Sequence, residues 1–185
     1  MATLLFYAIK SETQSLGRDW TRADREAYLQ LLPLSNNRIL YEITHPKSPR
    51  AYFSYFDSGL KNAQIYEDVL VFNIFRVDHP EIVAEIADFL MRAEGVNLVL
   101  GIGCYQQEGV LSLRTSSPEL RAGVLIRTIT EGLGTAGGHG MTAGGQIRPM
   151  PTEKTGQIDL EKRLVERLFE ALGRPLPAPQ PLIDE

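Results

Sequence analysis

Residues 132–145 hold seven of the chain's 16 glycines, and this segment limits the possible folds and functions more than any other. It reads Gly-Leu-Gly-Thr-Ala-Gly-Gly-His-Gly-Met-Thr-Ala-Gly-Gly. Glycine tolerates backbone conformations that other residues avoid, and it lets backbone N–H groups come close to an anion. His139 adds a donor that can be charged near neutral pH. We therefore interpret the segment as a glycine loop that binds an anionic group.

Three other interpretations fit this segment less well. Flexible linkers are typically rich in serine, which is absent here, and seldom carry an embedded histidine. A P-loop requires a Gly-Lys-Ser/Thr sequence, which does not follow. A dinucleotide-binding fingerprint opens a helix after a strand, whereas these glycines precede a predicted strand.

A second polar cluster lies upstream, where Ser112-Leu113-Arg114-Thr115-Ser116-Ser117 ends a predicted strand and enters a predicted helix. An arginine with hydroxyl groups near a helix N-terminus is suited to clamp a phosphate. The alternative is a surface arginine beside a serine N-cap. Residues 105–150 carry four arginines against three acids, whereas residues 78–94 carry five acids against one arginine. The glycine-rich half is thus the more favourable place for an anion.

The hydrophobic pattern predicts an α/β (α+β) fold, in which a mixed β-sheet flanked by helices follows a strand and a helical segment. The apolar run Thr3–Ile9 predicts a buried strand. Thr21 with Asp24 predicts a helix start, and a second short helix is expected from Ser35. An aromatic cluster, expected to pack in a core, follows at Tyr52, Phe53, Tyr55 and Phe56.

The second unit is predicted as strand, helix, two strands, helix, glycine loop, strand and helix. We expect the strands at Val69–Val77, Val96–Tyr105, Val110–Thr115 and Gln146–Met150. We expect the helices to begin at Asp78 (with Pro80 and Glu81 in the first turn), at Ser117-Pro118 and at Asp159. We place the domain boundary between residues 65 and 66.

Composition excludes several classes of protein. A net charge of -4 and a pI of about 5.5 argue against a protein that coats nucleic acid through bulk charge. The apolar runs are shorter than the roughly 20 residues that span a membrane. The lone Cys104 forms no internal disulfide and no thiolate metal site by itself, which indicates a reducing, cytoplasmic location. We expect Cys104 in the core, because it shares a strand face with Leu100 and Ile102.

The motif Ser112-Leu113-Arg114-Thr115-Ser116, followed by a helix and by Gly137-Gly138-His139-Gly140-Met141-Thr142-Ala143-Gly144-Gly145, resembles the DHH-associated domain of DHH phosphoesterases. Members of that family include RecJ exonucleases and nanoRNase-type phosphodiesterases, and a related domain occurs in alanyl-tRNA synthetases. The resemblance covers roughly residue 66 to the final helix. Ala136 stands where the family motif has its first glycine.

The resemblance extends to the first residues, where Ala2 to Thr13 is similar to the last motif of the catalytic DHH domain. The family has a metal-binding Asp-Thr pair there, and this chain has Glu12, whose longer side chain makes metal ligation doubtful. The Asp-x-Asp and Asp-His-His motifs are absent, and the three histidines are not adjacent. We expect a fragment of a longer enzyme or a relative that lost its catalytic half, inactive by itself and retaining no metal.

The resemblance implies a hydrolase family that uses Mn²⁺ to cleave phosphodiesters, with this chain as its substrate-recognition part. Short single-stranded oligonucleotides or cyclic dinucleotides are the implied partners, and a homodimer is compatible with it. The implied phosphate-binding residues are Arg114, Thr115, Ser116, Gly137, Gly138, His139 and Ala143, with His139 closest to catalysis. The alternatives are a non-catalytic nucleic-acid-binding or oligomerisation module, as in the synthetases, and an unrelated α/β ligand-binding domain.

Overall fold

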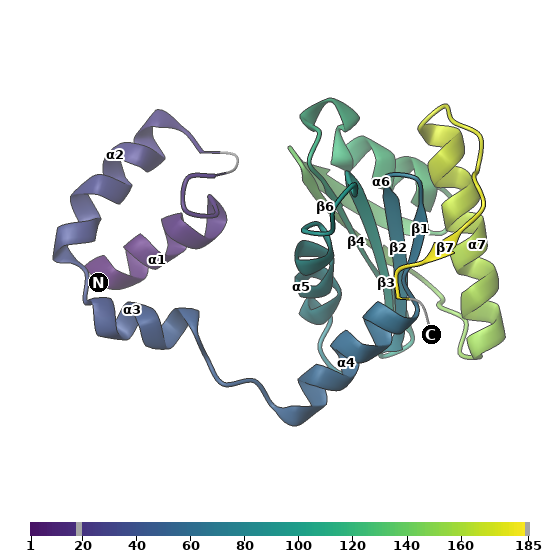
Figure 1. Cartoon of the computed structure of the whole chain (residues 1–185), viewed down its shortest axis with the longest axis horizontal. Helices are drawn as coiled ribbons and strands as arrows, with labels where there is room; N and C mark the ends of the chain where they lie inside the picture. Colours follow the sequence, from purple (N-terminus) through teal and green to yellow (C-terminus); the bar gives the residue numbers. More distant parts are fainter. Residues whose placement is uncertain (18–19, 184–185) are drawn as a thin grey trace. The chain divides into compact units, whose positions relative to one another are not determined.

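The computed structural model describes residues 1–17 and 20–183 and shows two compact units, Met1–Pro49 and Arg50–Glu185 (Figure 1). Helix α4 (Arg50–Lys61) belongs to the second unit because it packs on the sheet there. The border between compact units therefore lies before α4, and a border after residue 65 would cut strand β1 (Gln64–Tyr66). The identity of residues 1–65 as the end of a catalytic domain stays a prediction.

Unit 1 is helical. It consists of α1 (Ala2–Glu12), α2 (Arg22–Leu31), a short 3-10 turn (Leu32–Leu34) and α3 (Asn37–Thr44). The strand predicted over Thr3–Ile9 is wrong, because a short apolar run does not by itself distinguish a strand from a helix. The predicted helix start at Thr21 is confirmed: its hydroxyl accepts from the Asp24 N–H, and the Asp24 carboxylate accepts from the Thr21 N–H at 2.8 Å. Among the described residues of this unit, only Phe6 and Thr13 are buried.

Unit 2 is built on a mixed seven-stranded sheet in the order β5-β6-β4-β3-β2-β1-β7. The remaining strands are β2 (Val69–Arg76), β3 (Leu98–Tyr105), β4 (Glu108–Thr115), β5 (Gly134–His139), β6 (Thr142–Ile147) and β7 (Gln180–Pro181). Strands β2 and β3 are parallel, and the other pairings between described strands are antiparallel. The predicted mixed α/β fold is confirmed.

Helices cover both faces of this sheet (Figure 1). One face packs against α4 and α5 (Glu81–Leu90), and the other packs against α6 (Ala122–Thr130) and α7 (Lys154–Ala171). Because successive side chains of a strand point to opposite faces, Val71 enters the core under α6 and α7 while Leu70 and Phe72 enter the core under α4 and α5. The two parallel strands are buried on both sides and anchor the unit.

Two local expectations around α4 and α5 need correction. Asp78 is not the N-cap of α5: Pro80 occupies that position without a side-chain cap, and the Asp78 carboxylate accepts a hydrogen bond from the Tyr55 hydroxyl at 2.8 Å. The expected aromatic core is formed only in part. Tyr55 and Phe56 pack against the core under α4, whereas Phe53 is 64% exposed.

The glycine-rich segment is not a loop. It forms the hairpin of β5 and β6, so the strand expected at Gln146–Met150 lies earlier in the sequence and ends at Ile147. Cys104 packs against the core but is only half-buried, because β3 ends one residue later. Helix α7 starts five residues before Asp159, at Lys154, and no helix of the described residues is long and apolar enough to cross a membrane.

A partly buried acid on α7 makes stability depend on pH. The fully buried Asn73 of β2 donates from Nδ2 to the Glu161 carboxylate at 3.0 Å. Burial raises the pKa of Glu161, and the hydrogen bond from Asn73 offsets this only in part. A carboxyl group with a raised folded-state pKa contributes most stability below its unfolded value, and this contribution is lost as the pH rises through the folded value.

We predict that Glu161→Gln raises the free energy of unfolding at pH 7, since the amide oxygen still accepts from Asn73 without a partly buried charge. The gain should vanish near pH 4, where the native carboxyl group also becomes neutral. Urea unfolding at both pH values measures this, with the exposed Glu166→Gln on the same helix as control. An equal gain at both pH values would contradict the electrostatic explanation.

Candidate functional site

A cavity of about 300 Å³ lies between α5, β4 and the β5–β6 hairpin. Five of the residues predicted for phosphate binding line it: Arg114, Gly137, Gly138, His139 and Ala143. The other lining residues are Pro80, Ala84, Val110, Leu111, Ser112, Thr142 and Gly144. Two motifs that are separate in the sequence thus meet in one place, because β6 pairs with β4 and places Thr142 opposite Arg114.

The alternation of strand β4 decides which of its polar residues reach the cavity. Ser112 and Arg114 point to the α5 side, where the cavity lies. Thr115 is not among the lining residues and is buried. Its hydroxyl donates to the Asn97 carbonyl at 3.0 Å and accepts from the Ser117 N–H at 3.0 Å. Thr115 therefore fastens the end of β4 and lies outside the site.

Arg114 is held rigidly. Its Nε donates to the Asp88 carboxylate at 2.8 Å, and its Nη1 donates to the backbone carbonyl of Leu113 at 3.1 Å. The side chain is only 13% exposed. In the sequence, Asp88 is only one of the five acids of residues 78–94. The sequence signal that could have assigned Asp88 to this site is its spacing. Pro80, Ala84 and Asp88 are four residues apart and share one helix face.

Ser112 contributes an unsatisfied hydroxyl. Ser112 is 3% exposed, and its Oγ has no hydrogen-bond partner among the described residues. A buried hydroxyl without a partner costs about 1–3 kcal/mol, so such a group binds a water, an ion or a ligand wherever one can reach it. A ligand with an acceptor oxygen in the cavity would satisfy it. Ser112 belongs to the sequence motif but not to the binding residues predicted from it.

The hairpin presents backbone rather than side chains. β5 is an edge strand, so alternate N–H groups of β5 point away from β6. A Cβ atom on Gly137 would meet no atom within 4 Å, so this position faces open space. A Cβ atom on Gly123 of α6 would lie only 2.3 Å from the Gly138 carbonyl oxygen. Glycine at 123 thus lets α6 lie directly on the hairpin.

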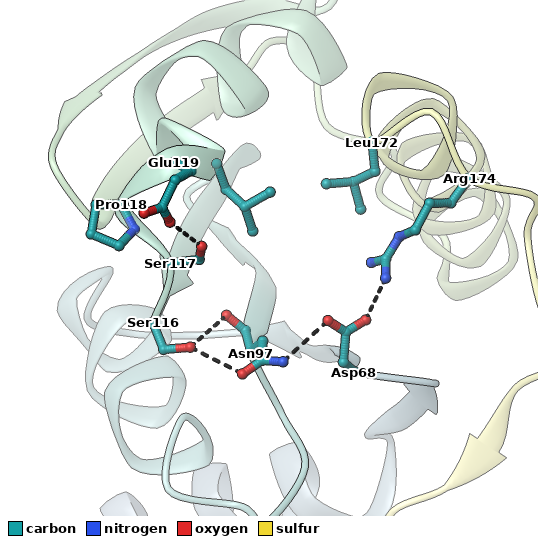
Figure 2. Close-up of a pocket in the computed structure, with 9 residues that line it drawn as sticks. Asp68, Asn97, Ser116, Ser117, Pro118, Glu119, Leu172 and Arg174 are labelled. Carbon is teal, nitrogen blue, oxygen red and sulfur yellow. Dashed lines mark hydrogen bonds and ion pairs between the residues drawn. The ribbon is translucent and has the colours of Figure 1, made fainter.

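Ser116 belongs to a different cavity, of about 660 Å³, at the start of β2 and β3. Figure 2 shows Ser116 directed toward Asn97, to whose side-chain oxygen its hydroxyl donates at 3.1 Å. The Asn97 side-chain amide in turn donates to the Asp68 carboxylate at 3.3 Å. Asp68 also forms an ion pair with Arg174 at 2.7 Å. Burial raises the pKa of Asp68, but hydrogen bonds from Arg174 and Asn97 outweigh it and the net pKa is lowered. These polar groups bind one another, so the structure does not bring Ser116 to the Arg114 cavity.

His139 stands at the end of β5, between two hollows. Besides the Arg114 cavity, it lines a hollow of about 240 Å³ together with Arg121 and Arg127. The helical pattern alone makes Arg127 a solvated residue in mid-helix. It is exposed on α6, but it lies beside Gly138–Gly140, so the positive charge around the hairpin extends beyond Arg114.

Glu12 belongs to no group of potential metal ligands among the described residues. It is an exposed residue at the end of α1, rather than the end of a strand as expected. Within the described ranges, 1–17 and 20–183, no three His, Cys, Asp or Glu side chains gather in a way that could hold a metal ion. The donor set of these described residues therefore does not fit the Mn²⁺ centre that the resemblance implies.

Comparison with known proteins tests the resemblance. No protein-family model matches the chain. A solved exopolyphosphatase-related protein from Bacteroides fragilis superimposes with a TM-score of 0.64 at 13% identity, covering 89% of this chain and 49% of that protein. The chain has the fold of a DHH-family protein. The predicted resemblance is thus confirmed at the level of the fold.

Two further similar proteins are much longer than this chain. An uncharacterized protein of Methanocaldococcus jannaschii is 24% identical over 172 residues, which cover 92% of this chain and 35% of the relative. RecJ from Thermus thermophilus, solved in complex with Mn²⁺, matches with a TM-score of 0.43 and 16% identity over 94% of this chain and 24% of RecJ. The chain spans about a third of the length of the curated relative and about half that of the exopolyphosphatase-related protein.

We predict opposite outcomes for two glycine substitutions at the hairpin. Gly123→Ala should lower the free energy of unfolding by about 1–3 kcal/mol, because the methyl group would overlap the Gly138 carbonyl. Gly137→Ala should change it by less than about 0.5 kcal/mol, since its methyl group enters open space. Chemical denaturation measures both. Equal effects of the two substitutions would show that the contact between α6 and β5 is not tight in solution.

Proposed function

We propose that this chain is the nucleotide- and phosphate-recognition part of a DHH phosphoesterase that acts on short oligonucleotides or cyclic dinucleotides. The observation that carries the proposal is the convergence of Arg114, Ser112 and the Gly137–His139 backbone on one cavity. Phosphate is the group that this donor set suits best, because it accepts several hydrogen bonds and carries negative charge.

Each group has a distinct role in the proposed site. Arg114 provides positive charge, and Asp88 fixes its orientation before the ligand arrives. The Ser112 hydroxyl donates to a phosphate oxygen and thereby gains the partner that it lacks. Gly137 has no side chain, so a phosphate group can lie directly against the backbone of the hairpin. The His139 imidazole adds a further hydrogen-bond donor next to the bond to be cleaved.

No hydrolytic step is assigned to this chain, because its described residues do not fit the family's metal centre. The relatives are longer, and the proposal places the metal-dependent chemistry in the additional part of such proteins. A cytoplasmic location agrees with the unpaired Cys104.

We predict that Ser112→Ala and Arg114→Ala weaken binding of a dinucleotide such as pGpG but differ in their effect on folding. Arg114→Ala should weaken binding about 10- to 100-fold, as expected for a charge-assisted hydrogen bond. Ser112→Ala should weaken binding while leaving the free energy of unfolding unchanged or higher, because it removes an unsatisfied buried hydroxyl. Titration calorimetry at low salt, together with urea unfolding, measures both effects.

The exposed Arg163→Ala on α7 removes one charge from the opposite side of the sheet and serves as control. If Arg163→Ala weakens binding as much as Arg114→Ala, general electrostatics explains the binding and the proposed site is wrong.

We further predict that the purified chain does not hydrolyse pGpG in the presence of Mn²⁺, even where it binds the dinucleotide. Turnover at rates usual for enzymes would contradict the assignment of this chain to recognition alone. The same assay can be run on the chain joined to the additional part of its longer relative. If that protein binds pGpG but does not hydrolyse it, the alternative of a non-catalytic binding or oligomerisation module is favoured.

A further inference from the structure

A separate cavity of about 500 Å³ lies where the parallel strands β2 and β3 end. Its lining residues are Arg76, Val77, Asp78, Cys104, Tyr105, Gln106, Gln107, Thr152 and Gln157. None of them lines the Arg114 cavity. In open α/β sheets, ligands bind beyond the carboxyl ends of parallel strands, and this volume is ordinary for a small-molecule site.

Gln157 of α7 lines this cavity and carries a buried acceptor. It is 6% exposed, and its Nε2 donates to the Pro151 carbonyl at 2.8 Å. This bond fixes the orientation of the amide, because a carbonyl oxygen can only accept. The other end, Oε1, is buried without a hydrogen-bond partner among the described residues. The missing partner is therefore an N–H or O–H donor.

A hairpin turn and a bulge shape the backbone around the cavity. The two residues of the β3–β4 turn, Gln106 and Gln107, have φ values of 46° and 69°, which is the ordinary geometry of a two-residue hairpin turn. Phe75, just before the end of β2, has a φ of 55°. In the β2–β3 register, Asn73 pairs with Ile102 but Arg76 pairs with Cys104, so β2 contains one extra residue. This bulge brings Arg76 level with Cys104 at the cavity.

One cation and one acid, Arg76 and Asp78, line the rim, and the Asp78 carboxylate accepts a hydrogen bond from the Tyr55 hydroxyl. Arg76 is exposed, and no ion pair between described residues includes it. Helix α7 begins beside Thr152, and its N-cap, Glu153, makes no side-chain capping bond. The first N–H groups of a helix attract anions, so the rim combines a guanidinium group with a helix N-terminus. The rim is suited to an anion and the interior to a neutral donor.

We propose that this cavity binds a small ligand of the nucleoside monophosphate class. The base would donate a ring or amino N–H to Gln157 Oε1, and the phosphate would lie at the rim between Arg76 and the start of α7. A neutral base N–H fits the buried acceptor better than an ammonium group, because burying a charge is costly. The proposal does not depend on the function proposed for the Arg114 cavity.

Cys104, the chain's sole cysteine, lines this cavity and reports on its occupancy. Guanosine 5′-monophosphate, whose base carries N–H donors, should slow the reaction of Cys104 with a thiol reagent in a saturable manner. Arg76→Gln and Gln157→Met should each raise the concentration needed for protection about tenfold, as expected for loss of one hydrogen bond. Arg163→Gln, on the exposed side of α7, should leave it unchanged.

Two comparisons separate this site from the Arg114 cavity and test the two halves of the ligand. Protection should persist in Arg114→Gln, and guanosine or inorganic phosphate alone should protect more weakly than the nucleotide. The proposal is overturned if the nucleotide gives no protection, if protection is lost with Arg114 but kept without Arg76, or if guanosine protects as well as the nucleotide. If Gln157→Met does not fold, Arg76→Gln at the exposed rim decides.

Discussion

The contact between the backbones of α6 and β5 determines where the candidate phosphate site lies. Gly123 leaves no room for even a methyl group against the Gly138 carbonyl, so the helix lies directly on the hairpin. The hairpin in turn pairs through β6 with β4, which carries Ser112 and Arg114. A larger residue at the helix–hairpin contact would displace the edge of the sheet and separate the backbone donors from the arginine. Several of the glycines that mark the segment thus serve close packing as well as binding.

Sequence patterns predicted the parts of the fold in which local preference and burial agree. The strands at β2 and β3 and the capping box at Thr21 were predicted because alternation, β-branched residues and capping residues all indicate the same structure. The strand predicted over Thr3–Ile9 is wrong, since an apolar run of that length fits either a strand or a helix. The glycine segment is predicted as a loop because glycine has low strand propensity, and only the pairing of β6 with β4 and of β5 with β6 makes it a hairpin of two strands. The grouping of Arg114 with Gly137–His139 was predicted through resemblance, whereas Asp88 and Ser112 required the tertiary structure.

Arg114 and Ser112 illustrate two ways to prepare a site for an anion. Arg114 is already paired, so Asp88 reduces its net charge but holds the guanidinium in one orientation. Ser112 is unpaired, so its hydroxyl is the group with most to gain from a ligand. A site of this kind selects for ligands with well-placed acceptor oxygens more than for negative charge alone. Its specificity then depends on geometry, and its affinity depends less on ionic strength than that of an open basic patch.

The two units differ in how much of their stability they can supply for themselves. Unit 2 has two extensive apolar cores, whereas Phe6 is the one apolar side chain buried among the described residues of unit 1. A helical segment of this size with so small a core does not persist against the entropy of the unfolded chain. Leu29, Leu34 and Tyr41 are among the exposed apolar side chains of unit 1. Local opening costs least where few apolar side chains are buried, so a protease would cut within residues 1–49 before it cut unit 2.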